Sequence, residues 1–408
     1  MKQSTLIPHL FRTEFSKITA VLCKHFGMAH IAIAEDIASE TFVSALEIWP
    51  RQGIPDNPTA WLYTVAKNKA KNHINRRVTF TQKIAQNLSN IPLESQEIDI
   101  DLSEQNVTDS QLQMLFAICH PVISKEAQIG LALRILGGFG IDEIADAFLT
   151  SKETINKRLY RAREKLRSEQ VAIVMPDESE IHERLDTVLT TLYLLFSEGY
   201  YSESQNTVIR KDLCLEAMRL TYLLIENQST NCPSVNALLA LMCFHTSRFD
   251  ARKNERGELI LYRDQDESLW NKDLMAKGAY FLHQASHGAE VTRYHLEASI
   301  AYWHTVKSDT PEKWKTILRL YDQLLEKNSS PIAALNRVFA FSKVHGKSEA
   351  IAEAEKLKLT NNHFYFTLLG ELYTGVDNQK AKTSFQEALS LAKTNTDRQV
   401  IQTNVDRL

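Results

Sequence analysis

The sequence predicts an all-α protein with two small helical domains followed by a longer helical repeat. Apolar residues recur at helical spacing in almost every periodic segment, whereas the alternation typical of β-strands is nearly absent. At 408 residues the chain is long enough for two or three domains with separate cores. We expect domains at residues 1–80, 106–170 and 180–408, with an acidic linker at residues 81–105.

Composition limits the classes of function. The net charge of −3 means that any basic surface is local. No apolar run approaches the roughly 20 residues of a spanning helix, and the N-terminus lacks the apolar core of a secretory signal. The five cysteines are scattered without metal-ligand spacing. These features predict a cytoplasmic protein with reduced thiols and no membrane contact.

The first domain contains two helices of opposite charge. Residues 34–49 place four apolar side chains on one side (Ala38, Phe42, Ala45 and Trp49) and four acids outside it (Glu35, Asp36, Glu40 and Glu47). Taken alone, such acids usually mark a solvated face.

A second helix of this domain is predicted to begin at Pro58 after an Asn57 N-cap. It buries Leu62, Val65, Ala66 and Ala70, and it accumulates the cations Lys67, Lys69, Lys71, Arg76 and Arg77. Trp61, Tyr63, Asn68 and Asn72 accompany these cations, a mixture that suits unstacked bases beside phosphates. The alternative, equally supported by this segment alone, is that Trp61 belongs to the core and the lysines provide solubility.

Residues 141–167 predict a helix-turn-helix. Ile141, Ile144, Ala145 and Phe148 form the stripe of a short helix; Leu149-Thr150 interrupts it, and Ser151 is a good N-cap for the next helix. That helix has a narrow apolar stripe of Ile155, Leu159, Ala162 and Leu166. Its remaining surface carries seven cations, which are Lys152, Lys157, Arg158, Arg161, Arg163, Lys165 and Arg167. We favour DNA binding over a merely solvated helix.

The C-terminal residues contain repeat signals. Leu369-Gly370, Tyr373, Ala381, Phe385 and Ala388 follow the tetratricopeptide pattern with one residue fewer in the turn, which predicts stacked helix pairs. Residues 248–270 form a polar stretch with an expected short extended segment at 257–262. This stretch is either a charged surface loop or a pocket or docking site formed by Arg252, Arg256, Arg263, Asp264, Asp266 and Trp270.

Chemistry-bearing motifs are missing from the sequence. The glycine-rich residues 136–140 lack the Gly-Lys of a phosphate-binding loop and are expected to turn the chain before the helix-turn-helix. No HExxH pair and no nucleophile–base–acid set can be assigned. We therefore expect a protein that is not an enzyme, with no catalytic residue, no metal and no cofactor.

Two segments together resemble a known family. AEDIASETFVSALEIWP followed by NPTAWLYTVAKNKAKNHINRR resembles region 2 of the extracytoplasmic-function (ECF) sigma factors of bacterial RNA polymerase, and EAQIGLALRILGGFGIDEIADAFLTSKETINKRLYRAREKLR resembles their region 4. The residues from RLDTVLTTLYLLFSEGYY onward are similar to the subgroup with a tetratricopeptide-like C-terminal extension. One departure is Leu149-Thr150-Ser151, where the family usually has Gly-Val/Ile-Ser.

The resemblance implies partners and roles for individual residues. Core polymerase would be bound by Asp36, Glu40 and Phe42. The promoter −10 element would be contacted by Trp61, Lys67, Asn68, Lys69, Asn72 and Arg76. The −35 element would be contacted by Ser151, Lys152, Glu153, Thr154, Asn156, Lys157 and Arg161. The acidic linker would thread toward the polymerase active centre and RNA exit path.

The resemblance thus predicts a sigma factor that directs core polymerase to promoters and is regulated by its fused C-terminal domain, with intramolecular contact between that domain and the sigma domains. Two alternatives remain at this stage. One is a ligand-sensing regulator that binds duplex operators without polymerase, although such a protein does not need the helix pair of residues 34–77. The other is a repeat scaffold whose basic helices are incidental.

Overall fold

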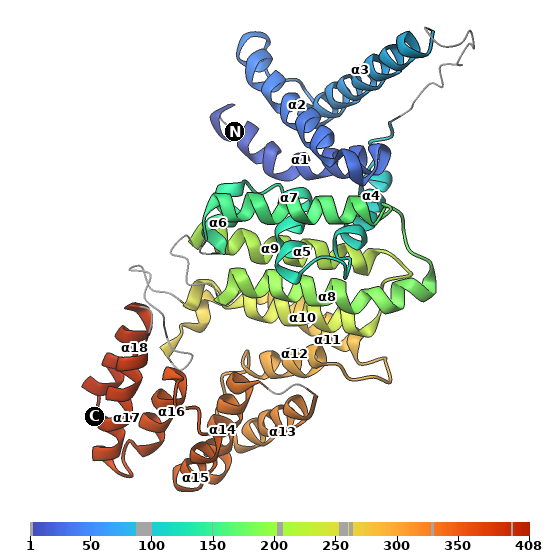
Figure 1. Ribbon diagram of the computed structural model, residues 1–408. Helices are drawn as coiled ribbons and strands as arrows, with labels where there is room; N and C mark the ends of the chain where they lie inside the picture. The colour runs from blue at the N-terminus through green and yellow to red at the C-terminus, as the bar shows by residue number, and fades with distance from the viewer. Residues whose placement is uncertain are drawn as a thin grey trace. The chain divides into compact units, whose positions relative to one another are not determined.

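The computed structural model describes residues 3–86, 100–148, 150–201, 207–252, 260, 264–327, 330–392 and 395–408. These residues form helices and contain no β-strand, which confirms the predicted all-α class (Figure 1). They pack as two compact units, Met1–Thr230 and Asn231–Leu408. None of the described helices has the length and apolar character needed to cross a membrane.

The first unit begins with three helices, α1 (Gln3–Phe26), α2 (Ile31–Gln52) and α3 (Pro58–Gln86). Glycines at positive φ end α1 and α2, namely Gly27 (φ 82°) and Gly53 (φ 88°). Asn57 caps α3 as predicted, because its side-chain oxygen accepts from the backbone N–H of Ala60 at 3.0 Å. The predicted inner residues of α2 and α3 are confirmed as core with one exception, Val65, which is half-buried. The buried residues are Ala38, Phe42, Ala45, Trp49, Leu62, Ala66 and Ala70.

Four further helices form the second part of this unit. They are α4 (Glu104–Ile118), α5 (Lys125–Leu131), α6 (Ile141–Ala147) and α7 (Lys152–Ser168). A π-helical turn at Ala132–Leu136 and Gly138 at φ 66° reverse the chain before α6, so the expected turn is confirmed. The interhelical turn contains Leu149, which lies outside the described residues, and α7 begins directly after Ser151.

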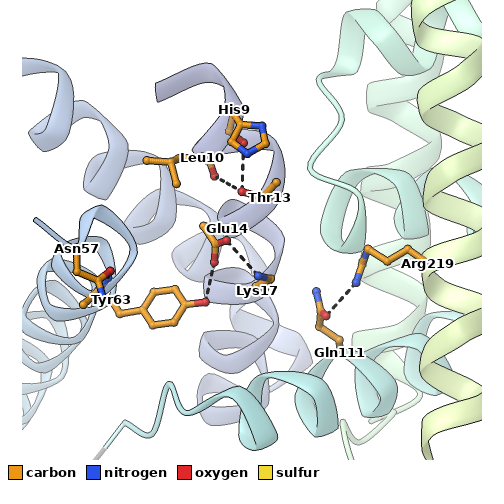
Figure 2. Close-up of polar contacts among 10 residues, drawn as sticks. His9, Leu10, Thr13, Glu14, Lys17, Asn57, Tyr63, Gln111 and Arg219 are labelled. Carbon is orange, nitrogen blue, oxygen red and sulfur yellow. Dashed lines mark hydrogen bonds and ion pairs between the residues drawn. The ribbon is translucent and has the colours of Figure 1, made fainter. Parts of the chain in front are cut away.

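The next two helices, α8 (Glu178–Tyr201) and α9 (Thr207–Glu226), also belong to the first unit. They contact α4, α5 and α6. Thr191 of α8 donates to Gln128 of α5 at 2.7 Å. Figure 2 shows a second contact, in which Arg219 of α9 donates to Gln111 of α4 at 3.1 Å. The sequence placed the start of the C-terminal region near residue 180, whereas packing divides the chain after Thr230.

The second unit is a succession of helices in which neighbours along the chain pack together. They are α10 (Pro233–Ser247), α11 (Lys272–Ala285), α12 (Arg293–Trp303), α13 (Pro311–Lys327), α14 (Pro331–His345), α15 (Lys347–Leu357), α16 (His363–Tyr373), α17 (Asn378–Leu391) and α18 (Asn395–Asp406). Short 3₁₀ turns occur at Asp250–Arg252 and Glu267–Leu269. Such an arrangement requires each helix pair to bury its apolar face against the next.

The repeat signal corresponds to the α16–α17 pair. A Cβ atom at Gly370 would lie 2.6 Å from the Phe385 ring, so this close approach requires glycine. Ala381, Phe385 and Ala388 are buried on the facing helix. The predicted helix pair, including the buried position of each of these residues, is confirmed.

The polar stretch of residues 248–270 is described only in part. The expected extended segment at 257–262 lies outside the described residues except for Ile260, and so do Arg256 and Arg263. Trp270 is 3% exposed, and the Arg248 guanidinium lies 5.9 Å from its ring centroid. Trp270 is therefore a core residue of the second unit.

Candidate nucleic-acid interface

Helix α7 has one buried stripe and an otherwise exposed surface. Ile155, Leu159, Ala162 and Leu166 are buried, as the sequence predicted. The Ser151 hydroxyl accepts from the Thr154 backbone N–H at 3.2 Å and caps the helix despite the departure in the preceding turn. All seven residues proposed for the −35 element are exposed: Ser151, Lys152, Glu153, Thr154, Asn156, Lys157 and Arg161.

A groove runs along α7 beside the first turn of α5. Its volume is about 610 Å³, and its lining includes four cations and no acid. The lining residues are Ile123, Ser124, Ala127, Thr154, Lys157, Arg158, Arg161, Ala162 and Lys165. The sequence assignment missed Arg158 and Lys165, although their helical spacing from Thr154 and Arg161 places them on the same face.

Ion pairs reduce the positive charge of α7 outside this groove. Lys152 lies 2.5 Å from Asp142, Arg167 lies 2.5 Å from Glu164, and Arg163 lies 2.9 Å from Glu35. Within the groove Lys165 pairs with Glu169 at 2.7 Å. The charge available to a partner is therefore concentrated at the middle of the helix, on Lys157, Arg158 and Arg161.

Glu35 joins α2 to the helix-turn-helix. Its side chain is buried, and its two carboxylate oxygens accept from Arg134 Nε and Arg163 Nη2, each at 2.9 Å. The interpretation of Glu35 as part of a solvated acidic face is wrong, because two arginines from the following domain cover it. Arg163 is correspondingly half-buried and turned away from the groove.

The outer face of α2 combines acids with apolar residues. Asp36, Glu40 and Glu47 are exposed, and so are Val43 (49%) and Leu46 (56%). Their spacing puts them on adjoining rows of one helical face. The sequence analysis did not identify Val43 and Leu46 as part of this face. The signal that could have identified them is the presence of two apolar residues on the acidic side of the helix.

Phe42 does not lie on this face. It is 3% exposed, and its ring is 5.0 Å from that of Phe11 and 6.4 Å from that of Phe15. The residue therefore supports α2 from the core. Any contribution of Phe42 to polymerase binding would act through the position of the helix.

The aromatic residues at the start of α3 are tied to the rest of the domain. Trp61 is half-buried, and its ring meets that of Trp49 edge-on at 5.4 Å. Tyr63 donates to Glu14 at 2.7 Å, and Lys17 donates to the other oxygen of Glu14 at 3.0 Å (Figure 2). Burial and this hydrogen bond raise the pKa of Tyr63. Both aromatics thus have structural roles, while part of Trp61 remains accessible.

The following turns of α3 carry the residues proposed for the −10 element. Asn68, Asn72 and Arg76 are exposed at i, i+4 and i+8, so they form one row along the helix. Lys67 and Lys69 are half-buried, and Lys69 lies 3.3 Å from Glu40 of α2. The two proposed contact surfaces of this domain therefore adjoin one another.

The acidic linker expected at residues 81–105 is described at its two ends, because residues 87–99 lie outside the described part of the chain. Its first six residues, 81–86, belong to helix α3, so the helix continues beyond the predicted start of the linker. Asp101 accepts from the backbone N–H of Ser103 at 2.8 Å, and Ser103 caps α4. Among the described residues, no group of three or more His, Cys, Asp or Glu side chains is placed to hold a metal ion.

Comparisons with known proteins agree with this geometry. Residues 10–79 match the model of sigma-70 region 2, and residues 69–172 match that of the ECF sigma factors. Residues 184–286 match a family of unknown function, DUF6596. No solved structure matches the chain.

Two relatives are similar to this chain, and the name of the second agrees with the family matches. The chain is 31% identical over 385 residues to an uncharacterized protein of Rhizobium meliloti, covering 93% of this chain and 90% of the relative. It is 25% identical over 153 residues to the ECF RNA polymerase sigma-E factor of Haemophilus influenzae, covering 36% of this chain and 79% of that protein. Sigma-factor families bind core RNA polymerase and promoter DNA and act as non-enzymatic regulators of transcription. This chain belongs to the ECF sigma factors of the sigma-70 family and carries a C-terminal extension.

Proposed function

We propose that this sigma factor binds core polymerase through the outer face of α2, the −10 element through α3 and the −35 element through α7. The polymerase supplies the chemistry of RNA synthesis, and the role places the protein in the bacterial cytoplasm. Each of the three surfaces lies on a helix whose opposite side is buried in a core. That packing holds each helix, and therefore its exposed surface, in place.

The observation that carries the proposal is the basic groove along α7. The groove lining contains no acid, and of its four cations Lys165 is paired with Glu169. At Lys157, Arg158 and Arg161 phosphates would therefore replace bound counterions rather than compete with carboxylates. The exposed Asn156 and Glu153 lie on the same capped helix and offer polar groups to base edges. This combination supports reading of duplex DNA in the major groove.

The row on α3 supports a different mode of contact. Asn68 and Asn72 each have an amide that both donates and accepts hydrogen bonds, and Arg76 continues the row with a phosphate-binding guanidinium. Bases that are splayed from the duplex expose the edges that such amides recognise. We therefore assign α3 to the melted −10 element.

Polymerase docking can be tested with a charge reversal on α2. Asp36→Arg is expected to abolish retention of the full chain on immobilised core polymerase and to remove transcription from a cognate promoter. Glu387→Arg makes the same charge change on an exposed position of α17 and is the matched control. Retention of Asp36→Arg at the level of the control would contradict the docking assignment, and initiation at that promoter without this protein would contradict the sigma role.

We further propose that the extension regulates the sigma domains through α8 and α9. Arg219 donates to Gln111 and to the Leu136 carbonyl, each at 3.1 Å, while Arg12 of α1 lies 3.5 Å from Asp212 of α9. These bonds give the extension direct contact with both α1 and the helix-turn-helix domain.

Truncation at the boundary between the units tests this regulation. A chain ending at Thr230 retains α8 and α9 and is expected to bind core polymerase normally. Its yield of promoter-specific transcript is expected to differ from that of the full chain, because the second unit is absent. Equal yields over a range of sigma concentrations would contradict a regulatory role for the second unit.

A further inference from the structure

The second unit contains a cavity of about 490 Å³ lined by residues from the segment before α13 and from α13 to α18. Its apolar lining includes Trp314, Leu368, Leu372 and Phe385, all of which are buried. The helices that carry them are coloured orange to red in Figure 1. A volume of this size, with an apolar interior and a few polar groups, is typical of small-molecule sites.

Cations outnumber acids in the lining. Four basic residues line the cavity (Lys307, Lys343, Lys347 and Arg407) against two acidic ones (Asp309 and Glu371). The lining therefore carries a formal charge of about +2, the difference between these two sets, although the whole chain is negative. A positive concave surface with apolar walls attracts anions with an apolar body.

Two of the lysines, Lys347 and Lys307, are each oriented by a backbone carbonyl. Lys347 Nζ donates to the Thr374 carbonyl at 2.6 Å, and Lys307 Nζ donates to the Gln265 carbonyl at 2.6 Å. A carbonyl fixes the position of an ammonium group but leaves its charge and its other N–H donors available. Lys307 also forms an ion pair with Glu267 at 3.7 Å, and Arg407 forms one with Asp264 at 3.8 Å. Both pairs are long, and no ion pair is described for Lys347 among the residues that the structure describes.

The two acids in the lining are held by other groups. Asp309 accepts from the indole N–H of Trp314 and lies 3.5 Å from Lys343, and these contacts hold its pKa below the usual value. Glu371 accepts from Asn404 at 3.4 Å. Lys343 also lies 5.5 Å from the Trp314 ring, so one cation, one acid and one aromatic ring form a local cluster. Lys307, Lys347 and Arg407 remain outside that cluster.

We propose that this cavity binds a small organic anion with two anionic groups on an apolar or aromatic body. The body would pack on Trp314, Leu368 and Leu372, and the anionic groups would accept from Lys307, Lys347 and Arg407. Charge-assisted hydrogen bonds are about twice as strong as neutral ones, so the anionic groups provide selectivity against neutral molecules of the same shape. The site lies entirely within the second unit and is independent of the promoter contacts.

The experiment uses the full chain and isothermal titration calorimetry. The probe is naphthalene-2,6-dicarboxylate, and its neutral counterpart is 2,6-bis(hydroxymethyl)naphthalene. We expect the dicarboxylate to bind with a Kd below about 1 mM and at least about tenfold more tightly than the neutral molecule. Equal binding of the two molecules, or no binding of the dicarboxylate, would overturn the proposal.

Variants identify the site. Lys347→Gln is expected to weaken dicarboxylate binding by about tenfold. Lys382→Gln, an exposed α17 position outside the lining, is expected to leave binding unchanged. Ser342→Met extends a half-buried side chain into the cavity without changing charge and should abolish binding. Thermal unfolding establishes that each variant is folded. Unchanged affinity for the dicarboxylate in both Lys347→Gln and Ser342→Met would mean that the probe binds elsewhere, and would reject this site.

Two further ligands test which class of anion the cavity binds. Inorganic phosphate is expected to bind at least about tenfold more weakly than the dicarboxylate, because it lacks the apolar body. Phosphate binding of equal strength would overturn the requirement for that body. Tight binding of an acidic hexapeptide together with no response to the dicarboxylate would assign the cavity to a peptide instead and reject the small-molecule proposal.

Discussion

Helices α3 and α7 are both basic, yet they present their charge in different ways. On α7 four cations line a groove of about 610 Å³, and the three cations outside the groove are each paired with an acid. On α3 the exposed row contains two amides and one arginine, and Lys69 pairs with Glu40 of the neighbouring helix. Similar composition therefore produces a charged groove on one helix and a hydrogen-bonding edge on the other.

The difference follows from what packs against each helix. The N-terminal turn of α5 lies beside α7 and forms the second wall of its groove, while Glu35 removes Arg163 from the outer surface. On α3 the proposed row of Asn68, Asn72 and Arg76 is exposed, and the aromatic start of the helix contacts Trp49 and Glu14. A groove suits the two phosphate rows of a duplex, whereas an open edge suits single bases.

The largest effect is expected from Glu35→Gln, which tests whether Arg163 is structural. The substitution leaves Arg134 and Arg163 without their shared carboxylate, and removing one member of a buried pair costs about 3 kcal/mol. The arginines are 23% and 25% exposed, so we expect about 2 kcal/mol of lost stability in the first unit. Urea-induced unfolding of the full chain, with hydrogen exchange reporting on residues 1–230, provides the measurement.

Glu40→Gln is the matched control for this change. Its pair with Lys69 spans 3.3 Å, but the Glu40 side chain is 64% exposed. Exposed pairs contribute little, so the loss should stay below about 0.5 kcal/mol. Equal losses of stability in the two variants would mean that Glu35 is no more important to the fold than a surface acid. Arg163 would then join the set of candidate DNA contacts.

Local features were the most predictable part of this fold from the sequence. The Asn57 and Ser151 caps and the apolar stripes of α3 and α7 depend on residues within two turns of one another, and each is present as predicted. The α16–α17 pair also followed from a local repeat signal, because the two helices are neighbours along the chain; the close approach of Gly370 to Phe385 was not predicted.

Features that depend on distant residues were not predictable in the same way. Glu35 and Asp36 are neighbours on a helix, but only Glu35 meets arginines that lie 99 and 128 residues further along. The packing of α8 and α9 into the first unit likewise depends on partners such as Gln128 and Gln111. Side chains from six helices line the cavity of the second unit, and helical periodicity does not predict which helices lie together around a cavity.

The next effect concerns the groove and compares two arginines of α7. Arg161→Ala removes a groove cation and should weaken binding of the polymerase holoenzyme to duplex −35 DNA by about tenfold, with the salt slope reduced by about one. Arg167→Ala removes an arginine paired with Glu164 outside the groove and should change affinity by less than about twofold. Fluorescence anisotropy over a salt series measures both quantities. Equal losses for the two variants would show that total charge, and not the groove, determines binding.

The smallest effect separates α3 from α7 by the form of DNA that each helix binds. Asn72→Ala deletes an exposed amide, and the loss of one neutral hydrogen bond weakens binding by about fivefold. We expect that loss with holoenzyme on a forked template whose −10 strand is unpaired, and no loss on duplex −35 DNA. Thr64→Ala, which changes an exposed α3 residue bonded to its own helix, is the control. Arg161→Ala should give the reverse pattern, with weaker binding to the duplex and little change in binding to the fork. If Asn72→Ala weakens binding to both forms of DNA, α3 does not discriminate between them and acts through charge and position, as α7 does.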